Sequence, residues 1–125
     1  RTGRSRSLLP RPRRVAALDQ AVIFHGGVRW WPPRLLPRLR ALTQACYLER
    51  AYGDCYGYLW ALRGYTDVVI DYGVKAWDMA PLFALARATG RVLVNFQGRS
   101  SFSGPDTIMA SPRLARLVTQ HLREC

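Results

Sequence analysis

The sequence has few acidic residues and few of the side chains that bind transition metals. Its 125 residues include eight Asp and Glu, two His and three Cys. The cysteines are odd in number and lack CxxC spacing, and the two histidines, His25 and His121, lie far apart. This pattern indicates neither a disulfide framework nor a zinc site, and it favours a reducing, cytoplasmic compartment.

Long apolar runs are also missing. No run approaches the roughly 20 residues needed to span a bilayer, and the Arg-rich start lacks the apolar core of a signal peptide. We therefore expect no membrane partner. The hydrophobic fraction of 49% predicts one globular domain with a substantial core.

Positive charge is in excess and unevenly distributed. Nineteen Lys and Arg against eight acids give a formal net charge of +11. We divide the chain into residues 1–14, a basic extended segment or the remnant of a preceding half, and residues 15–125, a single α/β domain. Residues 1–14 carry six arginines and no aromatic side chain for stacking on bases. Nucleic-acid binding by this segment is a possible function, and a solvated terminus is the simpler interpretation.

The hydrophobic pattern predicts an α/β layered domain in which helices cover a mixed β-sheet. Short apolar runs typical of strands occur at residues 21–24, 66–71, 91–96 and 107–110. Helical spacing follows at residues 34–49 and 79–89, and Ser111-Pro112 is a typical start for a last helix. The expected order is strand, two helices, strand, helix, two strands, helix. Pro81 is expected in the first turn of its helix.

Residues 52–82 contain the best candidates for a site. Asp54 is expected to cap a helix that Gly64 ends in the left-handed conformation. Asp71 ends the predicted strand at 66–71, and Asp78 is placed at the start of the next helix. The ends of strands that lead into helices are where α/β sheets bind ligands.

Three segments in this order, GDCYGYLWALRG, VVIDYGVKAWDMAPL and TIMASPRLARLV, resemble the C-terminal half of the inositol monophosphatase family. Within that family they are most similar to the histidinol-phosphatase branch, and the resemblance covers residues 15–122. It implies a Mg²⁺-dependent phosphomonoesterase of the same layered α/β architecture, a homodimer in the full enzyme and a role in histidine biosynthesis. It implies L-histidinol phosphate as the substrate, with an inositol or sugar monophosphate as the alternative.

The resemblance also assigns roles to residues. Asp78 occupies the aspartate of the WD motif, which is a metal ligand in the family. Asp54 and Asp71 match substrate-contacting positions, and Gly53 and Cys55 flank the same pocket. Asp71 suits a cationic amino alcohol, because a carboxylate accepts charge-assisted hydrogen bonds from an ammonium group. Capping of a helix remains an alternative role for Asp54, and a simple loop acid remains one for Asp71.

The first signature of the family, a DPxDGT-type segment preceded by a glutamate, is absent from this sequence. In the family that segment supplies most of the metal ligands. We therefore expect an incomplete Mg²⁺ site, no catalytic residue assigned within this chain, and a chain that is inactive until a missing N-terminal half or a partner chain completes it. A catalytically dead scaffold, associated with RNA through its basic residues, is the alternative from another class.

Two further features have open interpretations. His25, at the end of a strand, is a candidate ligand-binding residue, although a hydrogen-bonded structural histidine is the simpler expectation. The adjacent Trp30 and Trp31 are either an exposed surface for a partner or a cover over one end of the core.

Overall fold

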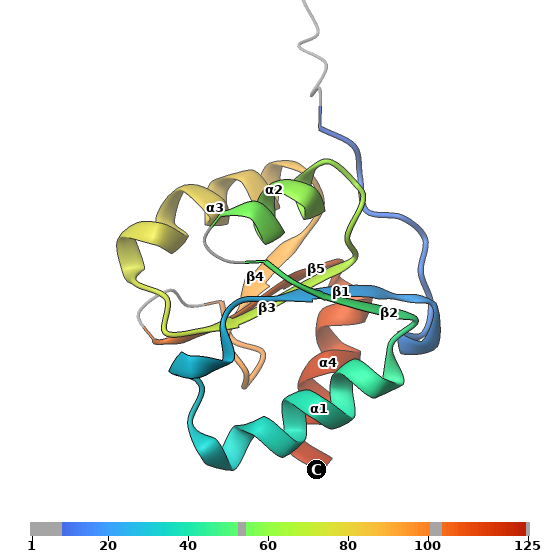
Figure 1. The fold of residues 1–125 in the computed structure, drawn as a ribbon. Helices are drawn as coiled ribbons and strands as arrows, with labels where there is room; N and C mark the ends of the chain where they lie inside the picture. The colour runs from blue at the N-terminus through green and yellow to red at the C-terminus, as the bar shows by residue number, and fades with distance from the viewer. Residues whose placement is uncertain (1–8, 53–54, 101–103, 125) are drawn as a thin grey trace, which may run out of the picture.

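A five-stranded mixed sheet forms the centre of the computed structural model, which describes residues 9–52, 55–100 and 104–124 (Figure 1). The strand order is β2-β1-β3-β5-β4. Strand β1 is parallel to both β2 and β3, whereas β5 is antiparallel to β3 and β4. The prediction of a mixed sheet is therefore confirmed. The strands are β1 Val22–His25, β2 Leu48–Ala51, β3 Val68–Tyr72, β4 Val92–Val94 and β5 Asp106–Ala110.

Helices cover both faces of the sheet and give three layers (Figure 1). Helices α2 and α3 lie on one face, and α1 and α4 lie on the other. Short 3₁₀ turns occupy Leu18–Gln20, Val28–Trp30 and Pro33–Leu35. None of the helices in the described part of the chain is long and apolar enough to cross a membrane. The helices are α1 Leu36–Ala45, α2 Tyr56–Leu62, α3 Ala76–Ala88 and α4 Pro112–Glu124.

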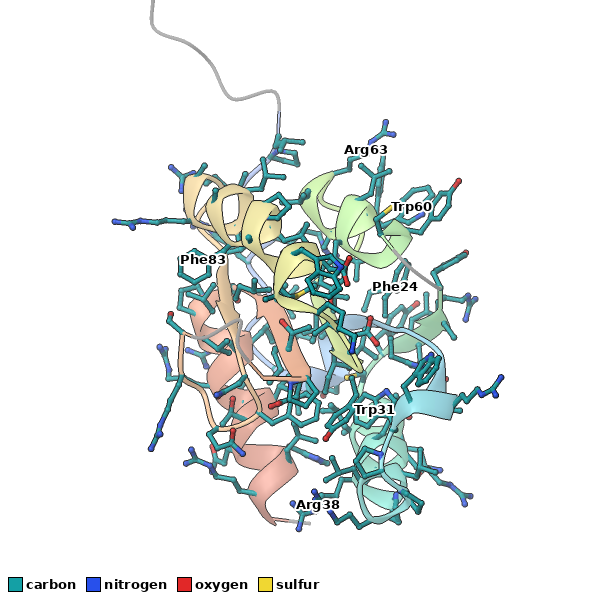
Figure 2. The ribbon with its side chains drawn as sticks, turned by 90° about the vertical axis from the view of Figure 1, so that its left-hand side faces the viewer. Phe24, Trp31, Arg38, Trp60, Arg63 and Phe83 are labelled. Atoms are coloured by element: carbon teal, nitrogen blue, oxygen red, sulfur yellow. The ribbon has the colours of Figure 1, made fainter. Side chains whose placement is uncertain are left out.

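Strand alternation divides the core into two clusters, one on each face of the sheet. In β3, Val68 and Ile70 pack toward α1 and α4, whereas Val69 packs toward α2 and α3. Phe24 lies on the α2 side and Trp31 on the α1 side, as Figure 2 shows. Because successive side chains of a strand point to opposite faces, these continuous apolar runs are what a sheet covered on both faces requires.

Two predicted element boundaries are wrong. The helix expected at residues 34–49 ends at Ala45, and the chain then forms strand β2 at the edge of the sheet. Helix α3 begins at Ala76, before the expected start. Pro81 therefore lies in the second turn of α3, where it removes the hydrogen bond that its N–H would have donated to Trp77.

The end of α2 follows the prediction. Gly64 has φ +85°, a left-handed conformation that glycine adopts without the clash a Cβ would cause. The backbone N–H of Gly64 donates to Ala61 O at 2.9 Å, and that of Tyr65 donates to Trp60 O at 3.0 Å. These two bonds form a Schellman motif, which satisfies the last carbonyl groups of the helix.

The described part of the basic segment packs on the domain. The guanidinium of Arg13 pairs with the carboxylate of Asp67, with Nε and Oδ1 3.0 Å apart. Asp67 also accepts the backbone N–H of Val22 at 2.8 Å, and Arg91 donates to the carbonyl oxygen of Pro10 at 2.9 Å. These contacts lie at the end of the sheet where β1, β3 and β4 begin, so residues 10–13 are held at that end. We call this arrangement the N-terminal clip.

Candidate functional site

The predicted site residues lie at the opposite end of the sheet, where the parallel strands β1 and β3 end. A cleft of about 720 Å³ opens there, between the β1 end, the β3 end and the first turns of α2 and α3. Its lining includes Asp71, Asp78 and Cys55. The structure therefore brings together three residues, the first and last of which are 23 positions apart in the sequence. Gly53 and Asp54, which were also predicted to bind substrate, lie outside the described residues.

Asp71 reaches the cleft because the neighbouring strand, β1, is followed by Gly26. Its Oδ1 accepts the backbone N–H of Tyr72 at 2.9 Å. Its carboxylate lies directly over Gly26, where a Cβ would be only 2.5 Å from Oδ1. Any other residue at position 26 would therefore have to displace this carboxylate. Nothing in the local sequence indicated this contact.

Asp78 lies in the first turn of α3 and not at its N-cap. The N-cap residue is Lys75, and Asp78 is the third residue of the helix. Its Oδ2 accepts the backbone N–H of Lys75 at 3.2 Å. A carboxylate here is stabilised by the positive end of the helix dipole and satisfies one of the free N–H groups. The expectation that Asp78 serves a helix start is correct, but its place in that start is different.

Tyr58 is a cleft residue that the sequence reasoning missed. It lies on α2, its side chain is buried, and its hydroxyl has no hydrogen-bond partner among the described residues. Burial raises the pKa of Tyr58 well above its ordinary value, and the negative charges of Asp71 and Asp78 raise it further. The Thr107 hydroxyl has a smaller, opposite effect on this pKa, although the two hydroxyls do not reach hydrogen-bond geometry. Tyr58 therefore keeps its proton.

Of the other candidate residues, Cys55 and Trp30 line the cleft and Trp31 does not. Cys55, at the N-terminus of α2, is exposed and lines the cleft. Trp30 is 67% exposed and forms part of the rim, where its side chain covers Gly73. Trp31 is instead a core residue, and its ring lies 5.4 Å from that of Phe96. The tryptophan pair thus divides between the site and the core.

His25 has a structural role. Its Nδ1 lies 2.8 Å from the carbonyl oxygen of Gly26, and its Nε2 lies 2.6 Å from Oε1 of Glu49. Both ring nitrogens are therefore engaged, and the second contact joins β1 to the edge strand β2. The expectation of a hydrogen-bonded structural histidine is confirmed.

The donor set of the cleft suits a hard cation only in part. Carboxylate oxygens are the ligands that Mg²⁺ prefers, and Asp71 and Asp78 provide them. Within residues 9–52, 55–100 and 104–124, however, no group of three or more His, Cys, Asp or Glu is arranged to hold a metal ion. The described lining of the cleft also contains no Lys or Arg. The cleft is thus electronegative, which favours a cationic group over a bare phosphate.

A second hollow, of about 690 Å³, lies between α4 and β4 and has the opposite character. Arg116 and Arg123 line it, and its described lining contains no acid. Nη2 of Arg123 donates to the carbonyl oxygen of Gln97 at 2.7 Å, so one of these cations is already engaged. None of the predicted site residues lines this hollow.

The described residues form the C-terminal half of an inositol-monophosphatase-like fold. An inositol monophosphatase from Zymomonas mobilis superposes with a TM-score of 0.85 at 22% sequence identity, over 91% of this chain and 46% of that one. The sequence homologues of this chain include a histidinol-phosphatase and SuhB. No family model matches the chain.

The identity is moderate and covers only part of each relative. Histidinol-phosphatase of Mycobacterium tuberculosis is 32% identical over 85 residues, which are 67% of this chain and 33% of that protein. Nus factor SuhB of Vibrio cholerae is 37% identical over 60 residues, which are 47% of this chain and 22% of that protein. The chain thus spans about a third or less of these relatives and just under half of the solved phosphatase.

Proposed function

We propose that this chain is the substrate-facing half of a Mg²⁺-dependent phosphomonoesterase that hydrolyses L-histidinol phosphate. The observation that carries the proposal is the meeting of Asp71 and Asp78 in one electronegative cleft at the ends of parallel strands. Similarity to a histidinol-phosphatase supports this substrate. The fold alone supports phosphatase ancestry without selecting a substrate.

Each carboxylate has its own task in this proposal. Asp71 accepts hydrogen bonds from the ammonium group of the amino alcohol, and its place over Gly26 fixes where that group binds. Asp78 would contribute one oxygen ligand to Mg²⁺. The metal, when bound, would supply Lewis-acid polarisation of the phosphoryl group and would favour ionisation of the attacking water. Cys55 lines the same cleft and is proposed to contact the alcohol. The family resemblance proposes the same contact for Gly53 and Asp54, which lie outside the described residues.

The proposal includes inactivity of the chain alone. Mg²⁺ binds through a few carboxylates, several waters and the substrate phosphate, and one carboxylate holds it weakly. The phosphate itself is repelled by Asp71 and Asp78 unless a cation lies between them. A complementary half of the fold, in a longer polypeptide or a separate chain, would supply the remaining ligands and the group that activates water.

The test is phosphate release from L-histidinol phosphate with Mg²⁺, by the 125-residue chain alone and together with a complementary N-terminal half from a homologous histidinol-phosphatase. We expect release only from the combination. Asp78→Asn should lower it by more than about 100-fold, because loss of a group that merely orients a metal ligand already costs roughly 10- to 100-fold. Asp19→Asn is the matched control, since Asp19 is exposed and lies outside the cleft. Release by the chain alone would show that its site is complete.

An inositol monophosphate is the second candidate substrate, favoured by the likeness to a solved inositol monophosphatase. The two substrates differ in charge, because inositol has no ammonium group. Asp71→Asn should therefore impair hydrolysis of L-histidinol phosphate more than that of inositol 1-phosphate. Equal losses on both would remove the reason to prefer the amino alcohol.

The alternative of an RNA-associated scaffold has weaker support. Within the described part of the basic segment, Arg13 is already paired with Asp67. The hollow with Arg116 and Arg123 is the better candidate for phosphate contacts. RNA binding that weakens steeply with salt and is lost in Arg116→Ala would support this alternative. Absence of binding at low salt would exclude it.

A further inference from the structure

The hydroxyl group of Tyr58 is buried near that of Thr107, and neither has a hydrogen-bond partner among the described residues. Tyr58 is 3% exposed, and its oxygen has no hydrogen-bond partner among the described residues. Folding removes such a group from water without replacing its hydrogen bonds, which is unfavourable. The ring accounts for the packing of Tyr58 in the cluster with Phe24 and Val69. Phenylalanine would make the same ring contacts, so packing does not explain the hydroxyl.

The position of Tyr58 gives the hydroxyl a use. It lines the cleft together with Asp71 and Asp78. At neutral pH the carboxylates accept hydrogen bonds and do not donate them. A tyrosine hydroxyl carries its proton at neutral pH, and can therefore donate. A phosphomonoester of an amino alcohol presents an ammonium group, which the carboxylates bind, and oxygen atoms, which require a donor.

We propose that the Tyr58 hydroxyl is a ligand-binding group of the cleft, which donates a hydrogen bond to an oxygen of the bound substrate or of its product alcohol. This inference rests on the proposed function, since it takes the amino alcohol as the ligand. A buried hydroxyl that gains its partner only from the ligand makes the free protein less stable and the complex tighter. The two consequences have opposite signs, which separates this role from a structural one.

The test compares Tyr58→Phe with Thr66→Val in the 125-residue chain. Thr66 is the matched control because its hydroxyl is also buried and unpartnered among the described residues, but does not line the cleft. Binding of L-histidinol, measured by calorimetry without metal, should weaken about 2- to 10-fold in Tyr58→Phe, as expected for one hydrogen bond. Thr66→Val should bind like the wild type. Neither variant should lower the thermal unfolding temperature.

The outcomes separate the inference from the proposed function. If the wild type binds L-histidinol and Tyr58→Phe binds equally well, the role of Tyr58 is wrong and the proposed substrate stands. If Tyr58→Phe unfolds at a clearly lower temperature while Thr66→Val does not, the hydroxyl has a structural partner and the inference is also wrong. If the wild type does not bind L-histidinol, the inference fails, and phosphate release with the complementary half decides the proposed substrate separately.

Discussion

Gly26 and Gly27 are neighbours in the sequence, but their surroundings differ. A Cβ on Gly26 would lie 2.5 Å from the carboxylate of Asp71, whereas a Cβ on Gly27 has no heavy atom within 4 Å. Asp71 is held by the backbone of its own strand and can move only by changing its rotamer. The size of the side chain at position 26 therefore controls where the carboxylate lies.

Gly26→Ala should move Asp71 and weaken L-histidinol binding about as much as loss of a charge-assisted hydrogen bond, roughly 10-fold or more. Gly27→Ala should bind like the wild type, because the added methyl meets open space. Calorimetric titration of both variants measures the difference. Equal affinities in the two would show that Asp71 does not contact the ligand.

The environment of Cys46 predicts a pH dependence of stability. Burial raises the pKa of the Cys46 thiol to about 11 from an ordinary value of 9.0, and the negative charge of Asp67 adds to the shift. Between these two pH values the unfolded chain releases this proton and the folded chain keeps it. Stability should therefore fall as pH rises from 9 to about 11.

This contribution is isolated by difference, because tyrosine and lysine titrate in the same range. Thermal unfolding of the wild type and of Cys46→Ala should be followed across that pH range. The wild type should lose more stability than the variant, with the loss absent below pH 9. Parallel curves for the two proteins would mean that the folded environment does not favour the protonated thiol.

Single residues show what the sequence can and cannot predict about the site. Asp71, Asp78 and Cys55 were predicted from strand ends, helix starts and resemblance, and they share one cleft. Tyr58 was missed because a tyrosine on a short helix reads as packing, and nothing local shows that its hydroxyl is unpartnered. The contact between Gly26 and Asp71 was missed for a related reason: it joins positions 45 residues apart and depends on the pairing of β1 with β3.

At the scale of elements, the missed strand β2 has a physical explanation. Its sequence, LERA, is polar, and three of its four residues are exposed. It gives no apolar alternation, and it follows α1 so closely that it reads as one more helical turn. Pairing with β1, from Val22 and Leu48 to His25 and Ala51, makes it a strand. An edge strand depends on its neighbour more than on its own propensity, which sequence reasoning cannot see.

The N-terminal clip predicts an element-scale effect on stability. The Asp67 side chain is 3% exposed and accepts hydrogen bonds from Arg13 and from the backbone of Val22. Asp67→Asn leaves the Arg13 charge without its partner and weakens both contacts. We expect a loss of about 1–3 kcal/mol in the free energy of unfolding, measured by urea titration.

Two control variants are compared with the stability loss of Asp67→Asn. Arg13→Ala should cost less than Asp67→Asn, because the Arg13 side chain is 50% exposed and water replaces much of its interaction. Asp19→Asn, at an exposed position, should change stability by less than about 0.5 kcal/mol. If Arg13→Ala costs as much as Asp67→Asn, the ion pair and not the bond to Val22 dominates the clip.

At the scale of the whole molecule, the two ends of the sheet have separate roles. The N-terminal clip covers the end where β1, β3 and β4 begin, and the cleft opens at the end where β1 and β3 end. Asp67 and Asp71 are only four residues apart, yet they lie at opposite ends of the sheet, because Asp67 precedes β3 and Asp71 lies near its C-terminal end. Substitutions in the clip should therefore change stability while they leave ligand affinity of the folded protein unaltered.

The outer side of α2 and the turn that follows it carry an apolar surface. Tyr56, Leu59, Trp60 and Tyr65 are all more than a third exposed. The Trp60 and Tyr65 rings lie 5.2 Å apart, so this part of the patch is continuous, and Figure 2 shows Trp60 on the outer side of its helix. Contiguous apolar patches of this kind are typical of association surfaces. We expect the 125-residue chain to self-associate through this surface as its concentration rises.

Leu59→Glu should shift the chain toward monomer, because a charge placed within the patch must be desolvated when two copies meet. Leu85→Glu is the matched control: Leu85 is similarly exposed, 40% against 47% for Leu59, but lies on α3. Light scattering across a concentration series gives the mass of each variant. Association that survives Leu59→Glu and is lost in Leu85→Glu would move the contact surface from α2 to α3. A wild-type chain that stays monomeric at the highest concentration would contradict the prediction, because the exposed patch would then not mediate self-association.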